Sequence, residues 1–200
     1  MFTGIIETTG KIISRQQEGS NIHFTIASGI SDELKTDQSV SHDGICLTVV
    51  KAASGAHTVT AIEETLERSN LKYRKVGDQM NLERSMLLNG RLDGHLVQGH
   101  VDEIAFCKNI EEKDGSWIIT FKVSKERSHL LVSKGSVSIN GVSLTVVRPT
   151  RKEFSVAIIP YTYDHTNFHH LRSGDAVNIE YDIIGKYVER AFLMRNNMVQ

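Results

Sequence analysis

The apolar and polar positions of this chain alternate over short stretches, a pattern typical of β-strands. In residues 45–50, Ile45, Leu47 and Val49 alternate with Cys46, Thr48 and Val50, so the two sets lie on opposite faces of one strand. Similar β-rich stretches, with turn-forming residues about every ten positions, are IIETTGKIIS (5–14), NIHFTIA (21–27), SVSHDGICLTVV (39–50), AHTVTAI (56–62) and QMNLER (79–84). Several short strands in about 90 residues predict a small closed β-barrel or a sandwich.

One of these stretches occurs twice. SVSHDGICLTVV at 39–50 returns as SVSINGVSLTVV at 136–147, with eight of twelve positions identical. At the same offset of 97, Asn70, Asn81 and Glu83 match Asn167, Asn178 and Glu180, whereas Gly4 matches Gly99 at an offset of 95. The difference predicts a two-residue insertion in the second unit. We therefore expect two related units, 1–88 and 95–183, joined by the linker LLNGRLDGH, and two similar pockets.

The end of the chain has a different pattern. The apolar residues Ile184, Tyr187, Val188, Ala191 and Phe192 recur at helical spacing, which predicts an amphipathic helix over 184–197. This helix either packs against its own unit or joins subunits, and the pattern leaves both open. Short helical pieces are also expected at 30–35, 64–71 and 124–132.

Composition and charge exclude several partners. The chain has 23 Lys and Arg against 24 Asp and Glu, with no basic stripe, so nucleic acid and anionic membranes have no electrostatic support. Its apolar runs are far shorter than a membrane span. The start, MFTGIIETTG, lacks a charged leader and an apolar signal core, so we expect a soluble cytoplasmic protein. Cys46 and Cys107 occupy unlike places in the repeats and are expected to be free thiols.

Each unit carries two small polar side chains on one strand face, Cys46 with Thr48 and Ser143 with Thr145. The glycine before each pair either makes a turn or lets another group approach the backbone closely. A single such side chain usually points to water, but two copies favour pockets that bind the edge of a flat heterocycle. Cys46 could be a nucleophile or a small core residue, and its role stays open because the second unit has Ser143 there.

The units differ where titratable groups would matter. Proton transfer near neutral pH suits a histidine and a carboxylate, and a reaction that treats two bound molecules differently needs such groups in one copy only. The unlike pairs are His100 with Ile5, Phe2 with Val97, Asp182 with Ser85, and Lys134 with Asp37. Each residue alone is more often structural than catalytic.

Metal and cofactor motifs are weak. His95 and His100 are five positions apart, which places them on opposite faces of a strand. No cysteine or carboxylate set completes a zinc site around His165, His169 and His170, and phosphate cradles and dinucleotide fingerprints are absent. We therefore predict no metal and no electron-carrying cofactor.

Five motifs together resemble the riboflavin synthase family over essentially the whole chain: MFTGIIE, NLER, GHLVQGHVD, NGVSLTVV and NIEYDIIGKYVER. The resemblance implies an all-β fold of two six-stranded Greek-key β-barrels, with a C-terminal helix that assembles a homotrimer. It implies a transferase for the final step of riboflavin biosynthesis. Two molecules of 6,7-dimethyl-8-ribityllumazine would give riboflavin and 5-amino-6-ribitylamino-pyrimidinedione, by transfer of a four-carbon unit and without a cofactor or metal. An association with lumazine synthase is a further expectation.

The resemblance also implies site residues, with an active site between the N-terminal barrel of one chain and the C-terminal barrel of its neighbour. The residues implicated in turnover are Phe2, Ser39, Cys46, His100, Ser143, Thr145 and Asp182. The N-barrel pocket would contain Gly4, Ile5, Ile6, Cys46, Leu47, Thr48, Thr60, Ala61, Ile62, Glu63, Glu64 and Thr65. The C-barrel pocket would contain Gly99, His100, Val101, Lys134, Ser143, Leu144, Thr145, Ala157, Ile158, Ile159, Pro160, Tyr161 and Thr162.

Two departures from the family pattern affect turns. Many relatives have Asn before the first glycine and Asp before the second, whereas this chain has Asp43 and Asn140. In addition, Asp93 stands where relatives commonly have a glycine before Gly94 and His95.

Two other functions are possible for the same fold: a non-catalytic lumazine or flavin carrier, and a flavin reductase domain. The carrier is disfavoured because Thr48 and Thr145 are both present, and the reductase because no nicotinamide-binding domain accompanies the barrels.

Overall fold

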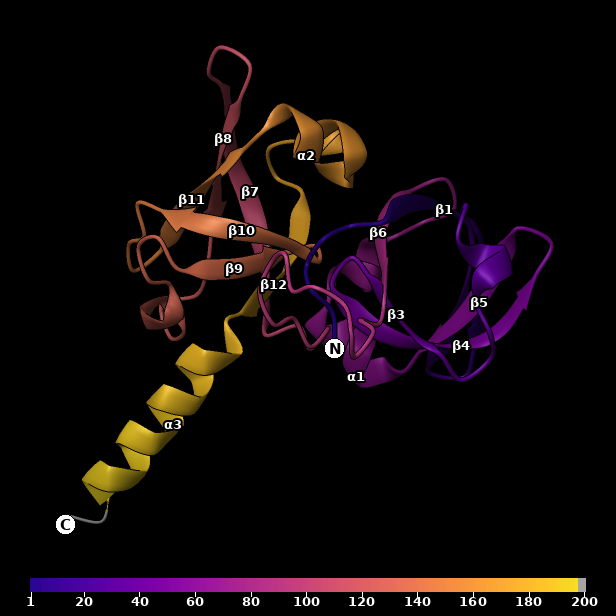
Figure 1. The fold of residues 1–200 in the computed structure, drawn as a ribbon, viewed down its shortest axis with the longest axis horizontal. Helices are drawn as coiled ribbons and strands as arrows, with labels where there is room; N and C mark the ends of the chain where they lie inside the picture. Colours follow the sequence, from indigo (N-terminus) through magenta and orange to yellow (C-terminus); the bar gives the residue numbers. More distant parts are fainter. Residues whose placement is uncertain (198–200) are drawn as a thin grey trace.

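The computed structural model describes residues 1–197, which form two closed, antiparallel six-stranded barrels and one long helix (Figure 1). The first barrel has the strand order β1-β2-β5-β4-β3-β6, and the second has β10-β11-β8-β7-β12-β9, the same circular order six strands later. The predicted all-β class with two six-stranded barrels is confirmed. The strands are β1 (Thr8–Glu18), β2 (Asn21–Ala27), β3 (Ser39–His42), β4 (Ile45–Ala53), β5 (Ala56–Ala61), β6 (Gln79–Arg84), β7 (Glu103–Glu112), β8 (Trp117–Lys122), β9 (Ser136–Ile139), β10 (Val142–Val147), β11 (Glu153–Ile158) and β12 (Ala176–Tyr181).

Short helices follow the same places in both units. The expected piece at 64–71 is helix α1 (Glu63–Arg68) with the 3-10 turn η2 (Asn70–Tyr73), and its counterpart, which the pattern did not predict, is α2 (Pro160–His165) with η4 (Asn167–His170). The pieces at 30–35 and 124–132 are only the 3-10 turns η1 (Ser31–Glu33) and η3 (Ser128–Leu130). The predicted two-residue insertion lies between β8 and η3, because five residues separate these elements, whereas three separate β2 from η1 in the first unit.

Each barrel encloses its own apolar core. In β4 the side chains of Ile45, Leu47 and Val49 are buried, while Cys46 and Thr48 point outward, as the alternation predicts. Cys107 of β7 is buried in the second core, and both cysteines are free. The two cores are separate, and much of the contact between the barrels is polar.

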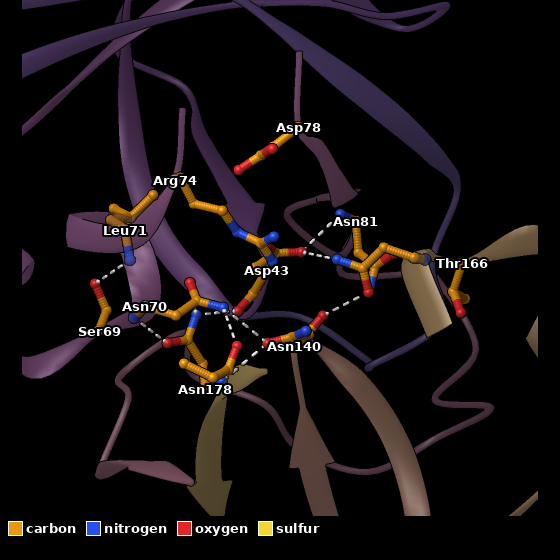
Figure 2. A network of polar contacts seen from close by, with 12 residues as sticks. Asp43, Ser69, Asn70, Leu71, Arg74, Asp78, Asn81, Asn140, Thr166 and Asn178 are labelled. Atoms are coloured by element: carbon orange, nitrogen blue, oxygen red, sulfur yellow. Dashed lines mark hydrogen bonds and ion pairs between the residues drawn. The ribbon is translucent and has the colours of Figure 1, made fainter. Parts of the chain in front are cut away.

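Polar side chains from both barrels form a buried network between them (Figure 2). The network is nearly symmetric: the backbone N–H of Asn70 donates to Asn178 Oδ1 and that of Asn167 donates to Asn81 Oδ1, both at 2.7 Å. Its six members are Asp43, Asn70, Asn81, Asn140, Asn167 and Asn178, all at most 6% exposed. Because a buried polar group is costly without its partner, this network fixes how the barrels face each other.

An ion pair breaks the symmetry of the network. Arg74 Nη2 donates to Asp43 Oδ2 at 2.5 Å, whereas the second unit has Asn140 and Leu171 at these places. Asp43 is fully buried, and a buried charge needs such a partner. The reversed order of Asp43 and Asn140 therefore has a local reason in Arg74.

Helix α3 (Ile183–Asn197) projects away from both barrels (Figure 1). Its base is tied to the second barrel by Lys186 with Asp102 and by His129 with Glu189. Apart from these contacts, the helix leaves six apolar side chains 50–71% exposed, namely Ile184, Tyr187, Val188, Phe192, Leu193 and Met194. The helix thus contacts its own barrel only at its start. Among residues 1–197, no helix is long and apolar enough to span a membrane.

Candidate active site in two composite pockets

Two segments that precede the barrels, 1–6 and 95–101, cross each other between them, and we call them the crossing segments. They pair antiparallel at Phe2 and Val97, where each backbone N–H donates to the other's carbonyl, at 2.7 and 3.1 Å. Past this point each segment lies along the other unit's barrel. Cys46 N donates to Gly99 O, and Ser143 N donates to Gly4 O, both at 2.8 Å.

The crossing corrects the expected grouping of pocket residues. Gly4, Ile5 and Ile6 were expected in the pocket with Cys46, but Gly4 lies against Ser143 and Ile6 packs on the second core. In turn, Gly99, His100 and Val101 lie beside Cys46. The contacts are close enough to require glycine: a Cβ on Gly99 would lie 2.6 Å from Cys46 Cβ, at a φ of +81°.

The pocket of the first barrel is a cavity of about 200 Å³. Its lining residues are Ile45, Cys46, Glu64, Thr65, Arg68, Ser69, Gly99, His100 and Val101. Arg68, which was not predicted, donates from Nε to Glu64 Oε1 at 3.1 Å across one turn of α1. The half-buried thiol of Cys46 and the exposed imidazole of His100 thus share one cavity with an ion pair.

The equivalent place on the second barrel has a different character. Ser143 replaces Cys46, and Ile5 of the crossing segment replaces His100. The pair at the positions of Glu64 and Arg68 is Tyr161 and His165, whose rings stack at 4.0 Å between centroids. The first site therefore has charged side chains at two positions where the second has stacked aromatic rings, and it has His100 where the second has Ile5.

A histidine that sequence reasoning considered only as a metal ligand lies at the second site. His95 Nδ1 is 2.6 Å from Ser143 Oγ, and the imidazole is buried. Burial lowers the pKa of His95, and the carboxylate of Asp182 opposes that shift. Asp182 also accepts from the N–H of Ile184 at 3.0 Å, so it caps helix α3. The three groups that meet here come from places far apart in the chain.

Two buried glutamates hold the crossing segments. Glu83 of β6 accepts from the backbone N–H of Thr3 and Gly4, and Glu180 of β12 accepts from those of Gln98, Gly99 and His100. Burial raises the pKa of both carboxyl groups, while the bonds that they accept oppose that shift. Only their match in the repeat, at an offset of 97, singled them out in the sequence.

Other predicted residues lie elsewhere. Phe2 is fully buried at the crossing and does not line the first pocket. The side chains of Leu47, Ala61 and Ile158 point into the barrel cores, which leaves only their backbone for a ligand. Lys134 is exposed on a turn with a left-handed backbone (φ +68°).

Most of the remaining predicted residues lie on outer strand faces or at the starts of the short helices. Ser39 pairs in register with Thr48 on neighbouring strands, and Thr60 Oγ1 is 2.9 Å from His23 Nδ1. The starts of α1 and α2 contain Ile62 and Glu63, and Ile159 and Pro160, respectively. In the second barrel, the side chains of Thr145 and Ala157 are exposed and that of Thr162 is half-buried. The side chain of Leu144 packs against the second core.

A larger cavity, of about 550 Å³, lies between the barrels beside the network and is lined in part by Asn70, Arg74 and Asn140. None of the predicted site residues lines it. We place the site at the smaller pocket because Cys46, of one small polar pair, and His100, one of the unlike titratable groups, both line it. Within residues 1–197, no group of three or more His, Cys, Asp or Glu side chains is placed to hold a metal ion.

Known proteins match this chain over both barrels. The model of the lumazine binding domain matches residues 3–85 and 98–182. Riboflavin synthase of Bacillus subtilis (strain 168) is 40% identical over 198 residues, covering 98% of this chain and 92% of that protein. Riboflavin synthase of Mycobacterium bovis is 36% identical over 205 residues, covering 98% and 99%.

Solved structures show the same fold at lower identity. The structure of LumP complexed with riboflavin superposes with a TM-score of 0.85 at 22% identity, over 90% of this chain and 99% of that one. LumP complexed with 6,7-dimethyl-8-(1'-D-ribityl) lumazine gives 0.82 at 21%, with the same coverage. With two matching domains and relatives 36–40% identical over nearly its whole length, the chain belongs to the riboflavin synthase family of enzymes.

Proposed function

We propose that each composite pocket binds one molecule of 6,7-dimethyl-8-ribityllumazine, and that a four-carbon unit passes between the two bound molecules. The products are riboflavin and 5-amino-6-ribitylamino-pyrimidinedione. The observation that carries this proposal is the pair of related sites whose reactive groups differ, Cys46 with His100 in one and Ser143 with His95 in the other. Two like sites suit two copies of one substrate, and unlike groups suit a donor and an acceptor.

Catalysis in this proposal is positional and acid–base. A C7 methyl proton of the donor is acidic because its anion delocalises into the ring, and the carbanion attacks the acceptor held opposite it. Holding both rings makes the reaction effectively unimolecular, which can contribute up to ~7–11 kcal/mol. His100 and Asp182 handle protons, while Cys46, Thr48, Ser143 and Thr145 bind ring edges. Ser39 lies beside Thr48 and supports that contact.

The assembly is also part of the proposal. The exposed apolar stripe of α3 supports a homotrimer in which the site forms between the N-barrel of one chain and the C-barrel of the next. We place the enzyme in the cytoplasm, with an association with lumazine synthase as a further proposal. The folding units are 1–88, 95–183 and the helix 184–197, with the crossing segments exchanged between the barrels.

A non-catalytic carrier of lumazine or flavin is the second candidate. LumP shares the fold and was solved with such ligands, but its identity to this chain is 21–22%, against 36–40% for the riboflavin synthases. The presence of Thr48 and Thr145, one on each barrel, favours an enzyme over a carrier.

Replacing the proposed proton-handling groups tests the assignment. We expect His100→Ala and Asp182→Asn each to lower kcat about 10²-fold or more, the usual contribution of a positioned acid or base. Asn keeps the cap of α3, so Asp182→Asn removes the charge without freeing the helix start. His170→Ala, at an exposed histidine beside the large cavity, is the matched control. Near wild-type turnover in both His100→Ala and Asp182→Asn would show that the roles are wrongly assigned.

A further inference from the structure

The glutamates that hold the crossing segments connect each barrel to the other barrel's pocket. Glu180 belongs to β12 of the second barrel, but the segment that it binds carries Gly99 and His100 into the first pocket. Glu83 belongs to β6 of the first barrel, but its segment brings Gly4 against Ser143 on the second barrel. The same arrangement therefore occurs twice, in opposite directions.

We propose that Glu83 and Glu180 are positioning residues that act crosswise, so that Glu180 shapes the lumazine pocket of the first barrel and Glu83 shapes that of the second. The proposal rests on the proposed function in taking lumazine as the ligand. Neither carboxylate lines the first pocket, and each acts through the backbone of the segment that it binds.

Both oxygens of each carboxylate are already in use. Oε1 of Glu180 accepts from Gln98 N at 2.7 Å, and Oε2 accepts from Gly99 N and His100 N at 2.8 and 3.0 Å. Oε1 of Glu83 accepts from Thr3 N at 2.6 Å and from its hydroxyl at 2.7 Å, and Oε2 accepts from Gly4 N at 3.0 Å. A glutamine must turn its NH₂ donor toward one set of N–H donors in either orientation. Only an ionised carboxylate satisfies both sets.

The position of the segment decides the shape of the first pocket. Gly99, His100 and Val101 form one wall of a cavity of only about 200 Å³, and Gly99 O holds the N–H of Cys46. Since a Cβ at Gly99 would already collide with Cys46, the segment has no room for an inward shift. An outward shift opens the wall and carries His100 away.

The chain contains a probe that reports on this pocket alone. Cys46 lines it and is half-buried, whereas Cys107 is 2% exposed in the second core. Alkylation by iodoacetamide, followed by peptide mass spectrometry, therefore measures the accessibility of Cys46 independently of turnover. Bound lumazine should slow the modification.

The test compares Glu180→Gln with Glu83→Gln, each the matched control of the other. We expect Glu180→Gln to raise the lumazine concentration that half-protects Cys46 at least about tenfold, because charge-assisted bonds at the wall are lost. Glu83→Gln should leave this protection near that of the wild type. Titration of lumazine binding should show one weakened site per chain in each variant.

The outcomes separate this proposal from the proposed function. If lumazine does not protect Cys46 in the wild type, the proposed function itself fails. If the wild type is protected but Glu180→Gln is protected equally, or if Glu83→Gln loses protection instead, the crosswise role is contradicted. Should Glu180→Gln fail to fold by circular dichroism, Gly99→Ala and Gly4→Ala decide, because each displaces one segment directly. Only Gly99→Ala should then lower the protection of Cys46.

Discussion

Two histidines in the core of the first barrel, His42 and His57, stand where the second barrel has Ile139 and Phe154. His42 Nδ1 donates to Val40 O at 3.1 Å, which leaves its Nε2 to accept from His57 Nε2 at 2.8 Å. His57 Nδ1 then accepts from the hydroxyl of Ser31 at 2.8 Å. Each ring nitrogen has its partner in the neutral state, and a proton added to His42 Nε2 would point at the N–H of His57.

This pair predicts that acid destabilises the protein. Burial lowers the pKa of His42 to about 3, helped by His57, and burial lowers the pKa of His57 to about 4. Both are near 6.5 in the unfolded chain, so their stabilising effect is complete above that pH and is lost as the pH falls toward 4. Because the two histidines take up close to two protons on unfolding, their own contribution to the free energy of unfolding should fall by roughly 2–3 kcal/mol per pH unit between roughly pH 5.5 and 4.5. Urea unfolding at several pH values measures this slope.

The second barrel supplies the control for that experiment. The double variant His42→Ile with His57→Phe copies its residues, and we expect the slope to be reduced by nearly the whole contribution of the pair. An unchanged slope would mean that other groups cause the acid sensitivity.

For single residues, the sequence predicted features that depend on neighbours in the same strand and missed contacts between residues far apart in the chain. The outward direction of Cys46 and Thr48 followed from the alternation within one strand. The bond between His95 and Ser143 joins residues 48 positions apart, and the bonds of Glu83 to Thr3 span 80, so no local pattern could show them. The resemblance implies that Phe2 takes part in turnover, and the structure places its backbone in a bridge with Val97, its counterpart in the repeat, which no local pattern could show.

At the scale of elements, strands and the repeat were predictable because alternation and turn residues act locally. The expected strand at 5–14 begins only at Thr8, since residues 1–6 leave their own barrel to form a crossing segment. The two crossing segments occupy equivalent positions in the repeat. The sequence therefore reads the same whether each segment lies against its own barrel or against the other one. The composite nature of the pockets could therefore be seen only in three dimensions.

Helix α3 makes its own prediction. We expect a chain that ends at Asp182, and the double variant Val188→Lys with Phe192→Lys, to sediment as monomers with little activity. Both changes remove the exposed apolar stripe that we propose to bury between subunits. Arg190→Ala, on the same helix, should remain a trimer. A truncated chain that still sediments as a trimer would contradict the assembly role of the helix.

At the scale of the whole molecule, two barrels of the same topology meet around an approximate two-fold axis. Gly44 and Gly141 approach each other on this axis: a Cβ on Gly44 would lie 2.6 Å from Gly141 N. Asn70, Asn81 and their counterparts, already evident in the repeat, are the residues that join the barrels. The symmetry is broken at Asp43 with Arg74 in the interface and at His100 with Ile5 in the pockets. The molecule thus carries two related but non-equivalent places, which we propose as its two binding sites.

The central claim is that these two sites convert one compound into two products. The most direct measurement mixes the purified protein with 6,7-dimethyl-8-ribityllumazine alone and follows all three compounds by chromatography. We predict one riboflavin and one 5-amino-6-ribitylamino-pyrimidinedione for every two lumazine molecules consumed, with no added cofactor. Tight binding of lumazine without formation of riboflavin would contradict the claim and identify the protein as a carrier.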